Sequence, residues 1–383
     1  MAATLSPAQQ QQLQRLTPVA DRFTQGLQCY VVGGAVRDAL LDQPAGDRDW
    51  VIVGSTPEAV AKRGFIPVGG DFPVFLHPIS KEEYALARTE RKSGRGYKGF
   101  TFYTGVDVSL EDDLQRRDLS INAMALGVDG KLVDPLNGLA DLNQKQLRHV
   151  GDAFIEDPVR LLRLARFAAR FVEFTIAEPT LVLAKQLVSN GEVDALVAER
   201  VWQELHKALA YPAPWRFFTV MHQVGALNRV FPGLALNEQV EQALALAVSR
   251  QLSVAERYAV LMAHTSDVVD LSQRLRAPSD YRDLARLCVE GLHSVVFAGD
   301  QASAAERLQW LEACDALRRP ERFTQLLRCL ACYGAVDSKH WETWLQQVKQ
   351  VDAGAIAKAY QGDGARIRQA VHQARIEALS TAC

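Results

Sequence analysis

Short apolar runs alternate with turn residues and helical stretches in the first 150 residues. The runs lie between residues 28 and 149 and include CYVVGG, DWVIVG, PVFLHP, EYALAR and GKLVDP. Runs of this length, bounded by Gly, Pro and charged residues, are typical of strands. The pattern therefore predicts a small mixed sheet with interspersed helices over residues 27–150.

A different pattern follows Asp157. Apolar residues recur at spacings of three and four, as in VRLLRLARFAARF, TLVLAKQLV, VWQELHKALA and QALALAVSRQL. This spacing puts apolar side chains on one face of a helix, and strand signals are almost absent. We therefore predict an all-helical remainder and an α+β fold class. Pro and Gly predict helix breaks at YPAPW, 211–215, which also suggests a subdomain boundary, and at FPGLAL, 231–236.

Composition excludes several classes of protein. The 383 residues, 48% hydrophobic and 23% charged, are enough for two or three domains. No run of about 18 apolar residues occurs, so we predict no membrane span. The first twenty residues carry one charged side chain, Arg15, and lack a secretory signal, so we expect a surface helix or a frayed tail. A net charge of −2 argues against a uniformly basic nucleic-acid binder, so any such surface must be local.

The six cysteines lack the spacing of a disulfide framework. This indicates free thiols in a reducing compartment, and we predict a cytoplasmic protein. Cys329 and Cys332 form a CxxC within TQLLRCLACYGAV, which has the pattern of a buried helix. A single CxxC without further Cys or His partners is a weak metal or redox signal, so we expect both cysteines to be structural.

Two aspartates, Asp47 and Asp49, stand two residues apart in GDRDWVIV. On an extended segment, side chains two apart face the same side. Two neighbouring carboxylates repel each other unless a cation lies between them, and such an all-oxygen pair suits Mg²⁺, whose other positions are left to water and substrate phosphates. The alternative is an exposed acidic start of a strand.

The segment VVGGAVRD precedes this pair. Gly33 and Gly34 end a predicted strand and open a helix, so backbone N–H groups there can approach phosphate oxygens. Arg37, one turn later, can add a charge-assisted contact. The chain has neither the GxxxxGK[ST] of a P-loop nor the GxGxxG of a dinucleotide fold. A phosphate cradle beside a carboxylate pair predicts a nucleoside triphosphate site.

Four arginines follow Asp157 and Pro158, a good helix start, at spacings of three, three and four. They lie on one stripe of the predicted helix and are Arg160, Arg163, Arg166 and Arg170. The interleaved apolar residues can pack on its other faces. A solvated basic face is the alternative to a binding surface.

Five segments, in order, resemble the motifs of polymerase-β-like nucleotidyltransferases, in the branch of bacterial tRNA CCA-adding enzymes and poly(A) polymerases. They are GGAVRDALL with DRD, LEDDLQRRDLSINAMAL, DPLNGLADL, EDPVRLLRLARFAAR and ERVWQEL. The resemblance implies a polymerase-β-like catalytic head at 27–150, after an N-terminal extension at 1–26. It further implies a helical neck at 151–210 for nucleotide selection, and a helical body and tail at 211–383 for tRNA binding.

The resemblance also implies residue roles. Asp47 and Asp49 match the catalytic pair that holds Mg²⁺. The nucleotide-binding positions match Gly34, Arg37, Arg117, Asp157, Arg160, Arg163 and Arg166. The supporting positions match Gly33, Asp38, Asp118 and Asn122, and Arg116 stands in the same pattern.

Base selection by such a site has a chemical logic. Cytosine and adenine each present an exocyclic amine beside a ring-nitrogen acceptor, whereas uracil and guanine present a carbonyl beside a ring N–H. A carboxylate and an arginine would pair with the first two and leave unpaired groups against the others. By resemblance, Asp157 and Arg160 are this pair, so protein side chains would replace a nucleic-acid template.

The implied partners are CTP, ATP and the acceptor and T-arm half of tRNA, held largely by shape and phosphate contacts. A poly(A) polymerase, a CC-only or A-only enzyme and a catalytically silent RNA-binding relative are the alternatives. Residues 87–113 are basic at the start and rich in Gly and aromatics, which predicts a mobile loop. The resemblance implies that such a loop belongs to full CCA-adding enzymes, so it favours full CCA addition. Residues 69–78 lack the Arg-rich character expected of the poly(A) polymerase branch.

The chain departs from one pattern among its relatives. Several bacterial relatives carry a His-Asp metal-dependent phosphohydrolase domain after the neck, but here His264 is followed by Thr265. A hydroxyl cannot replace a bridging carboxylate in a two-metal site. We therefore expect a degenerate body without hydrolase activity, in which His264 is a packed or surface residue.

Overall fold

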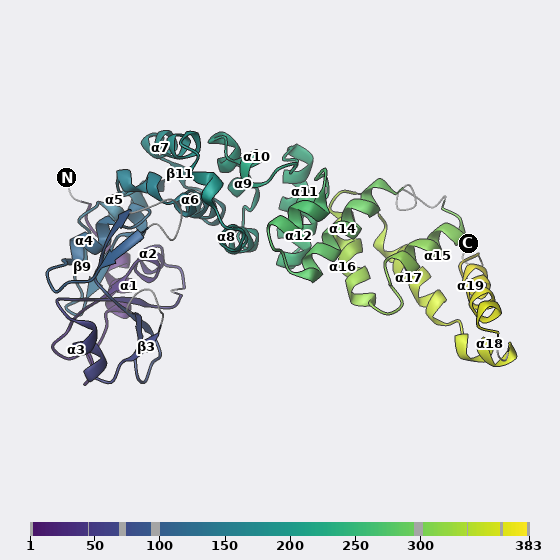
Figure 1. Cartoon of the computed structure of the whole chain (residues 1–383), viewed down its shortest axis with the longest axis horizontal. Coiled ribbons are helices and arrows are strands. Elements are labelled where there is room, and N and C mark those ends of the chain that lie inside the picture. Colours follow the sequence, from purple (N-terminus) through teal and green to yellow (C-terminus); the bar gives the residue numbers. More distant parts are fainter. Residues whose placement is uncertain are drawn as a thin grey trace. The chain divides into compact units, whose positions relative to one another are not determined.

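The computed structural model describes residues 3–44, 46–68, 74–92, 100–294, 302–334, 336–360 and 363–380. The chain forms two compact units, whose elements are labelled in Figure 1. Unit 1 consists of Met1–Arg200 and Thr219–Val230, and unit 2 of Val201–Phe218 and Phe231–Cys383.

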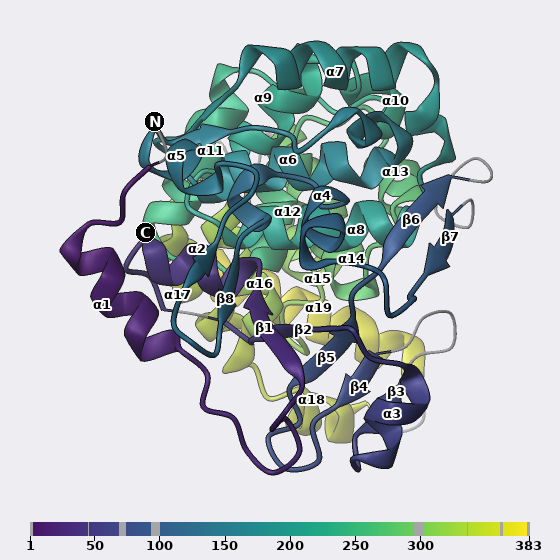
Figure 2. The ribbon, with the colours of Figure 1, turned by 90° about the vertical axis from the view of Figure 1, so that its left-hand side faces the viewer.

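A mixed sheet forms the centre of unit 1 and confirms the predicted sheet. The strands of the unit are β1 Gln28–Val32, β2 Asp49–Val53, β3 Ile66–Val68, β4 Val74–Leu76, β5 Glu83–Leu86, β6 Thr89–Lys92, β7 Phe100–Tyr103, β8 Ala125–Gly127, β9 Leu132–Val133, β10 Gln146–Leu147 and β11 Thr175–Ile176. The main sheet has the order β3-β4-β5-β2-β1-β8-β9 (Figure 2). Only its β2–β5 pair is parallel.

Helices and short 3₁₀ segments connect these strands. They are α1 Pro7–Leu16, α2 Gly34–Leu40, α3 Pro57–Lys62, α4 Leu110–Gln115, η2 Ser120–Asn122, α5 Gly138–Asn143, η3 Asp152–Glu156, α6 Pro158–Arg170, α7 Glu178–Ser189, η4 Glu192–Ala195 and α10 Leu227–Val230. The predicted N-terminal surface helix is α1, which packs on α2 and buries Leu13 and Leu16. The N-terminal segment is thus part of the packing of unit 1.

The central strands β1 and β2 bring the glycine turn and the aspartates together, because β1 ends where β2 begins. β1 and β2 are rich in Val and Ile, which favour strands, and Val31, Val51 and Ile52 are almost completely buried. Each such side chain contributes about 1.5–3 kcal/mol when it is removed from water. In the β1–β2 register, Val32 is opposite Asp49, so Gly33, the next residue, lies beside the start of β2.

A hairpin occupies part of the segment predicted to be a loop. β6 and β7 pair antiparallel from Thr89 opposite Tyr103 to Lys92 opposite Phe100, and α4 begins at Leu110. The prediction of a loop throughout 87–113 is therefore wrong for these strands and for α4. The β-branched and aromatic residues of β7 favour strand pairing, and the Ser109 capping box starts α4. Residues 93–99, like 69–73 of the 69–78 segment, lie outside the described residues.

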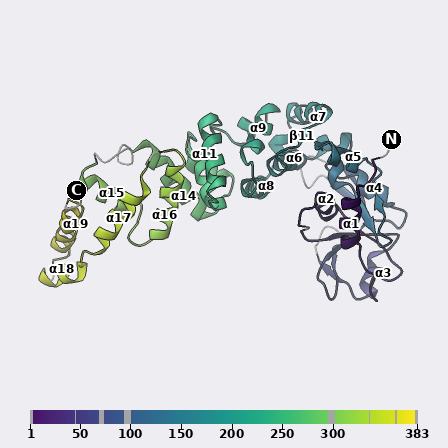
Figure 3. The same cartoon turned by 180° about the vertical axis from the view of Figure 1, so that it is seen from behind.

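Unit 2 is helical throughout its described residues. Its helices are α11 Glu238–Ser249, α12 Val254–Met262, α13 Val268–Arg274, α14 Ser279–His293, α15 Ala304–Ala313, α16 Pro320–Ala331, α17 Ser338–Lys349, α18 Ala353–Ala359 and α19 Gly364–Ser380. Helices α8 Ala198–Ala210 and α9 Trp215–Gln223 contribute residues to both units. α14 packs on α12 and α16, and α19 packs on α15 and α17 (Figure 3).

The predicted helical remainder is confirmed with one exception, the two-residue strand β11, which pairs in parallel with β10. The predicted breaks also occur: 211–214 separates α8 from α9, and 231–236 lies between α10 and α11. In the described part of the chain, no helix is both long and apolar enough to cross a membrane.

The CxxC lies in and just after α16, and both of its cysteines are buried, as predicted. Burial raises the pKa of Cys332 to about 11, so its thiol is neutral at pH 7. His264 packs edge-on against the ring of Tyr333, and burial lowers its pKa. No group of three His, Cys, Asp or Glu side chains in the described segments is arranged to hold a metal ion.

Candidate functional site

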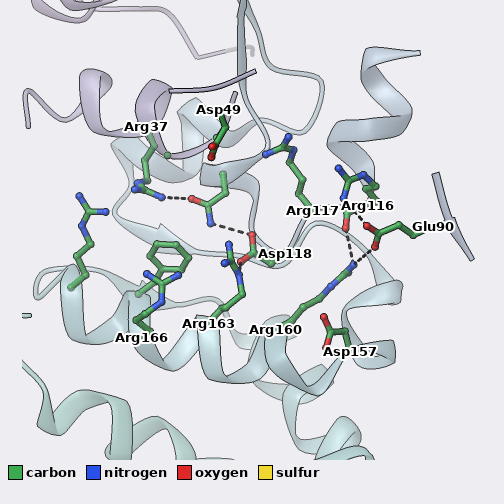
Figure 4. Close-up of a pocket in the computed structure, with 15 residues that line it drawn as sticks. Arg37, Asp49, Glu90, Arg116, Arg117, Asp118, Asp157, Arg160, Arg163 and Arg166 are labelled. Atoms are coloured by element: carbon green, nitrogen blue, oxygen red, sulfur yellow. Dashed lines mark hydrogen bonds and ion pairs between the residues drawn. The ribbon is translucent and has the colours of Figure 1, made fainter. Parts of the chain in front are cut away.

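A pocket of about 410 Å³ opens at the strand ends of the sheet, where β1 ends and β2 begins (Figure 4). Its walls come from the β1–α2 turn, the start of β2, β6, the segment from Arg116 to Asn122, and α6. It is lined by Gly33, Gly34, Arg37, Asp49, Glu90, Arg116, Arg117, Asp118, Asn122, Asp157, Arg160, Arg163, Arg166, Phe167 and Arg170. Seven arginines face four carboxylates there, so the pocket suits an anionic ligand.

The glycine turn lies under an arginine. Gly33 has φ 70°, a conformation that favours glycine, and its N–H donates to the Met124 carbonyl at 3.1 Å. A Cβ on Gly33 would lie 3.0 Å from Arg117 Nη1. The buried Nε of Arg117 has no hydrogen-bond partner among the described residues. Nη1, which lies over the turn, can donate a charge-assisted hydrogen bond to an anion bound there.

Arg37 is buried and held from several sides. Its Nε donates to Asp38 Oδ1 at 2.9 Å, and its Nη1 donates to Asn122 Oδ1. The guanidinium lies 5.1 Å from the ring centroid of Phe167 and 5.3 Å from that of Phe171. Burial lowers the pKa of Arg37, although Asp38 partly offsets the effect. The arginine is thereby fixed in one orientation toward the pocket.

Asp118 organises the floor of the pocket. It accepts hydrogen bonds from Asn122 Nδ2 at 3.1 Å, Arg163 Nε at 2.6 Å and the Leu119 N–H at 2.9 Å. Burial alone would raise the pKa of Asp118, but Arg163 and these hydrogen bonds outweigh it and hold the pKa well below its usual range. Of the supporting residues predicted from the sequence, Asp38 and Asn122 contact Arg37, and Asp118 contacts Arg163.

Asp49 lies between this pocket and a second hollow, whereas Asp47 lines the second hollow alone. Asp49 lines both, and the hollow, of about 510 Å³, is also lined by Gly46, Asp47, Arg48, Ser80, Lys81, Glu82 and Glu83. Figure 4 shows Asp49 between Arg37 and Arg117 in projection. Glu83 is opposite Asp49 in the parallel β2–β5 register. Asp49 is exposed, yet neighbouring protein atoms partly desolvate its carboxylate and raise its pKa, which Arg117 partly offsets.

These carboxylates fit a hard cation. They supply only oxygen atoms, which Mg²⁺ prefers, and Asp47 lies close enough to Asp49 to raise its pKa further. No three acidic, His or Cys side chains of the described chain form a complete metal cage. Mg²⁺ commonly takes only one or two protein carboxylates and completes its shell with water and substrate phosphates.

Asp157 and Arg160 both line the far end of the pocket. Asp157 caps α6, since its Oδ1 accepts a hydrogen bond from the Val159 N–H at 2.9 Å. Burial raises the pKa of Asp157, which the Val159 hydrogen bond and Arg160 counteract. Arg160 Nη2 donates to the Arg116 carbonyl at 2.7 Å and lies 3.8 Å from Glu90 Oε2.

The arginine stripe of α6 faces the pocket and is not a solvated basic face. All four arginines line the pocket, and the exposed fractions of Arg160 and Arg166 are only 8% and 7%. Arg166 lies 4.2 Å from the Phe167 ring centroid, and Arg170 Nη2 donates to Asp38 Oδ2 at 2.9 Å. The apolar residues between them are buried, and among them Phe167 also lines the pocket.

Two acidic residues at the site were missed by the sequence reasoning. Glu90, on β6, accepts hydrogen bonds from Arg116 Nη1 at 2.7 Å and Arg88 Nε at 3.1 Å. Asp113, on α4, lies behind the pocket wall and contacts Arg116 and Arg117. Asp113 had a local signal, because residues three and four apart on a helix are neighbours. Glu90 had no local signal that connects it to the pocket, since Arg116 and Arg160 are distant in sequence.

Two family models match the chain. The model described as the poly A polymerase head domain matches residues 29–148. The model described as the probable RNA and SrmB-binding site of polymerase A matches residues 173–237.

Curated relatives resemble nearly the whole chain. A CCA-adding enzyme of Bordetella bronchiseptica is 56% identical over 357 residues, covering 93% of this chain and 97% of the relative. A multifunctional CCA protein of Azoarcus sp. is 46% identical over 400 residues, covering 92% and 97%. Among solved structures, an apo form of a CCA-adding enzyme has a TM-score of 0.75 at 22% identity and covers 98% of this chain and 92% of its own. That likeness supports the α+β fold predicted from the sequence.

Proposed function

The chain belongs to the family of CCA-adding enzymes, and we propose that it adds and repairs the 3′-terminal CCA of tRNA with CTP and ATP. The reaction is nucleotidyl transfer to the tRNA 3′-hydroxyl, with pyrophosphate as the other product. The observation that carries the proposal is the arginine-rich pocket, which joins the glycine turn and Asp49 at one end to Asp157 and Arg160 at the other.

Nucleotidyltransferases of this kind use divalent metal ions, and we propose that Asp47 and Asp49 hold Mg²⁺ here. The bound metal would help to ionise the tRNA hydroxyl and would stabilise the charge that develops on the leaving pyrophosphate. The position of Asp49 between the pocket and the second hollow supports this role. The raised pKa of Asp49 fits a carboxylate that gains a cationic partner when substrate binds.

The triphosphate would bind at the glycine turn. Backbone N–H groups at Gly33 and Gly34 and the guanidinium groups of Arg37 and Arg117 would donate to its oxygens. Arg37 is pre-oriented by Asp38 and Asn122, and Arg117 has an N–H without a partner in the described structure. Little side-chain freedom is then lost on binding, which favours a defined position of the α-phosphate.

The base would lie near the start of α6. The Asp157 carboxylate would accept a hydrogen bond from the exocyclic amine of cytosine or adenine, and Arg160 would donate to the ring nitrogen. Arg160 uses one nitrogen to hold the Arg116 carbonyl, and its guanidinium has further N–H groups for the base. Arg163 and Arg166 line the middle of the pocket, where ribose or phosphate would bind.

The tRNA acceptor would be held by the helical residues 211–383, through local phosphate and shape contacts. In the cytoplasmic location that we propose, the buried cysteines of α14 and α16 would stay as thiols. Full CCA addition, rather than partial addition or poly(A) synthesis, is favoured by the curated relatives, which are named for CCA.

A direct test uses tRNA that lacks its CCA end, with CTP and ATP supplied singly and together. We expect two added residues with CTP alone and three with both nucleotides. Long tails with ATP would instead indicate a poly(A) polymerase. Addition that stops after CC, or that needs a CC end, would indicate a partial enzyme. No addition by the purified chain under any of these conditions would favour a catalytically silent RNA-binding relative.

A further inference from the structure

Asp113 is a carboxylate with no exposed surface, just behind the arginine wall of the pocket. Its Oδ2 accepts a hydrogen bond from Arg117 Nη2 at 3.1 Å. Its Oδ1 accepts hydrogen bonds from Arg116 Nε at 3.0 Å and Nη2 at 2.8 Å, and from the Arg88 backbone N–H at 3.2 Å. One buried group therefore binds two consecutive arginines and the residue that leads into the β6–β7 hairpin.

Through its Oδ2 atom, Asp113 holds Arg117, the arginine that lies over the glycine turn. Arg117 reaches over Gly33, and its Nη1 is the atom nearest to a Cβ built there. A guanidinium with several rotatable bonds would otherwise lose considerable freedom when it binds phosphate. The hydrogen bond to Asp113 holds the Nη2 end of the group, and Nη1 lies over the glycine turn.

The Oδ1 contacts of Asp113 hold Arg116, which in turn contacts Arg160 at the other end of the pocket. Asp113 and Glu90 hold the Arg116 side chain from two sides. The backbone carbonyl of Arg116 accepts the hydrogen bond from Arg160 at 2.7 Å, as Figure 4 shows. The position of Arg160 therefore depends on where Asp113 holds Arg116.

The charge of Asp113 is maintained by these partners. Burial by itself would raise the pKa of Asp113, but Arg117 and Arg116 outweigh this and lower it. The carboxylate is therefore ionised at neutral pH. A buried charge is tolerated only when it is paired and hydrogen-bonded, so the geometry of the two arginines around it is strongly constrained.

We propose that Asp113 is a positioning residue for nucleotide selection. It fixes Arg117 for the triphosphate and, through Arg116, fixes Arg160 for the base, so that one carboxylate aligns both ends of the nucleotide. The proposal rests on the nucleotide-binding roles given to Arg117 and Arg160 above. It adds a residue that touches no substrate and connects the two recognition events.

The test measures equilibrium binding of CTP, ATP and UTP to the full chain in Mg²⁺, without tRNA. Asp113→Asn keeps the size of the side chain but replaces an acceptor oxygen by a donor that faces arginine N–H groups. Loss of one charge-assisted contact corresponds to about a tenfold change or more. We expect weaker binding of CTP and ATP by that factor and a smaller preference for them over UTP. Glu111→Gln, an exposed carboxylate on the same helix, should leave both unchanged.

A second variant separates the effect on Arg160 from the effect on Arg117 and keeps the buried charge of Asp113. Arg116→Lys loses the paired contacts to Asp113 but leaves Arg117 in place. Because Arg160 would lose its position at the base, we expect CTP and ATP to bind several-fold more weakly and UTP binding to change less, which reduces the preference over UTP. In the Arg117→Ala background, Asp113→Asn should weaken CTP binding by much less than it does alone, because the shared partner is missing.

Two results would overturn the proposal. One is unaltered binding of all three nucleotides to a folded Asp113→Asn protein. The other is an unaltered preference over UTP in Arg116→Lys, which would exclude the connection to Arg160 even if Asp113→Asn does not fold. Because tRNA is absent, the measurement is independent of CCA addition. A chain that selects CTP and ATP but extends no tRNA would refute the proposed function and leave the role of Asp113 supported.

Discussion

Arg117 lies directly over Gly33, with Nη1 3.0 Å from the place that a Cβ would occupy. The two residues come from distant segments, and the bond between Gly33 N–H and the Met124 carbonyl holds those segments together. The absence of a side chain on Gly33 therefore permits both the turn and the close approach of the arginine. This relationship gives the first prediction.

The main effect of Gly33→Ala should be on triphosphate binding, with a smaller effect on the free energy of unfolding. The new methyl group would displace Arg117, and we expect the KM for CTP and ATP to rise about tenfold, as for a lost charge-assisted contact. Gly54→Ala is a matched control. Gly54 has a similar φ of 67°, yet a Cβ there would meet nothing within 4 Å. Similar KM changes in both variants would show that backbone strain, not Arg117, is responsible.

Asp49→Asn should slow transfer strongly but retain nucleotide binding. The variant keeps the side-chain size and loses the charge that would hold Mg²⁺, so we expect kcat to fall on the order of 10²- to 10³-fold. Rates are measured with tRNA lacking CCA, and CTP binding is measured separately. Glu58→Gln, an exposed residue on α3, serves as the control. Full activity of Asp49→Asn would refute the metal assignment.

Replacing Asp157 or Arg160 by Ala should relax base choice more than it weakens triphosphate binding. Each side chain contributes a polar contact that uracil and guanine cannot match, so its loss should narrow the kcat/KM ratio between CTP and UTP by about tenfold or more. Incorporation of each of the four nucleotides into tRNA is the measurement. Unchanged selectivity for C and A in both variants would exclude them as the templating pair.

Asp118→Asn should destabilise unit 1 in a pH-dependent way. The folded pKa of Asp118 lies well below that of the unfolded chain, about 3.9 for an aspartate. Its stabilising effect is therefore complete above pH 4 and is lost as pH falls toward the folded pKa. At pH 7 we expect the variant to lose about 2 kcal/mol of unfolding free energy.

Denaturant unfolding of both proteins from pH 7 to pH 2 would check this. The difference in unfolding free energy between the parent protein and Asp118→Asn should shrink as the pH falls below about 4. There Asp118 becomes protonated, first in the unfolded chain and then in the folded chain. Glu111→Gln should show no such trend. A difference that stays constant down to pH 2 would contradict the assigned pKa.

The body should have no phosphohydrolase activity. His264 packs against Tyr333, and no metal-binding cluster occurs among the residues that the structure describes. We expect no hydrolysis of phosphomonoesters or 2′,3′-cyclic nucleotides with Ni²⁺ or Mg²⁺, measured by phosphate release. Activity that is present in the purified protein and lost in His264→Ala would show that the domain is still an enzyme.

Local sequence patterns predicted the elements that carry the site, because the relevant contacts are close in sequence. The turn at Gly33, the helix start at Pro158 and the arginine spacing in α6 each follow from residues that are close neighbours in sequence. The contacts between elements could not be predicted in this way. Glu90 meets Arg116 and Arg160 only because the β6–β7 hairpin forms, and that segment had the composition of a loop.

The site proposed for the triphosphate also depends on the order in which the chain is made. β1 completes its pairing only when β8 is available, because Val32 lies opposite Ala125 and Gly33 bonds to Met124. On the ribosome, the strand that ends at the glycine turn must keep one edge open until those residues emerge. A chain released early would expose that edge without a nucleotide pocket, and such fragments would be substrates for chaperones or proteases.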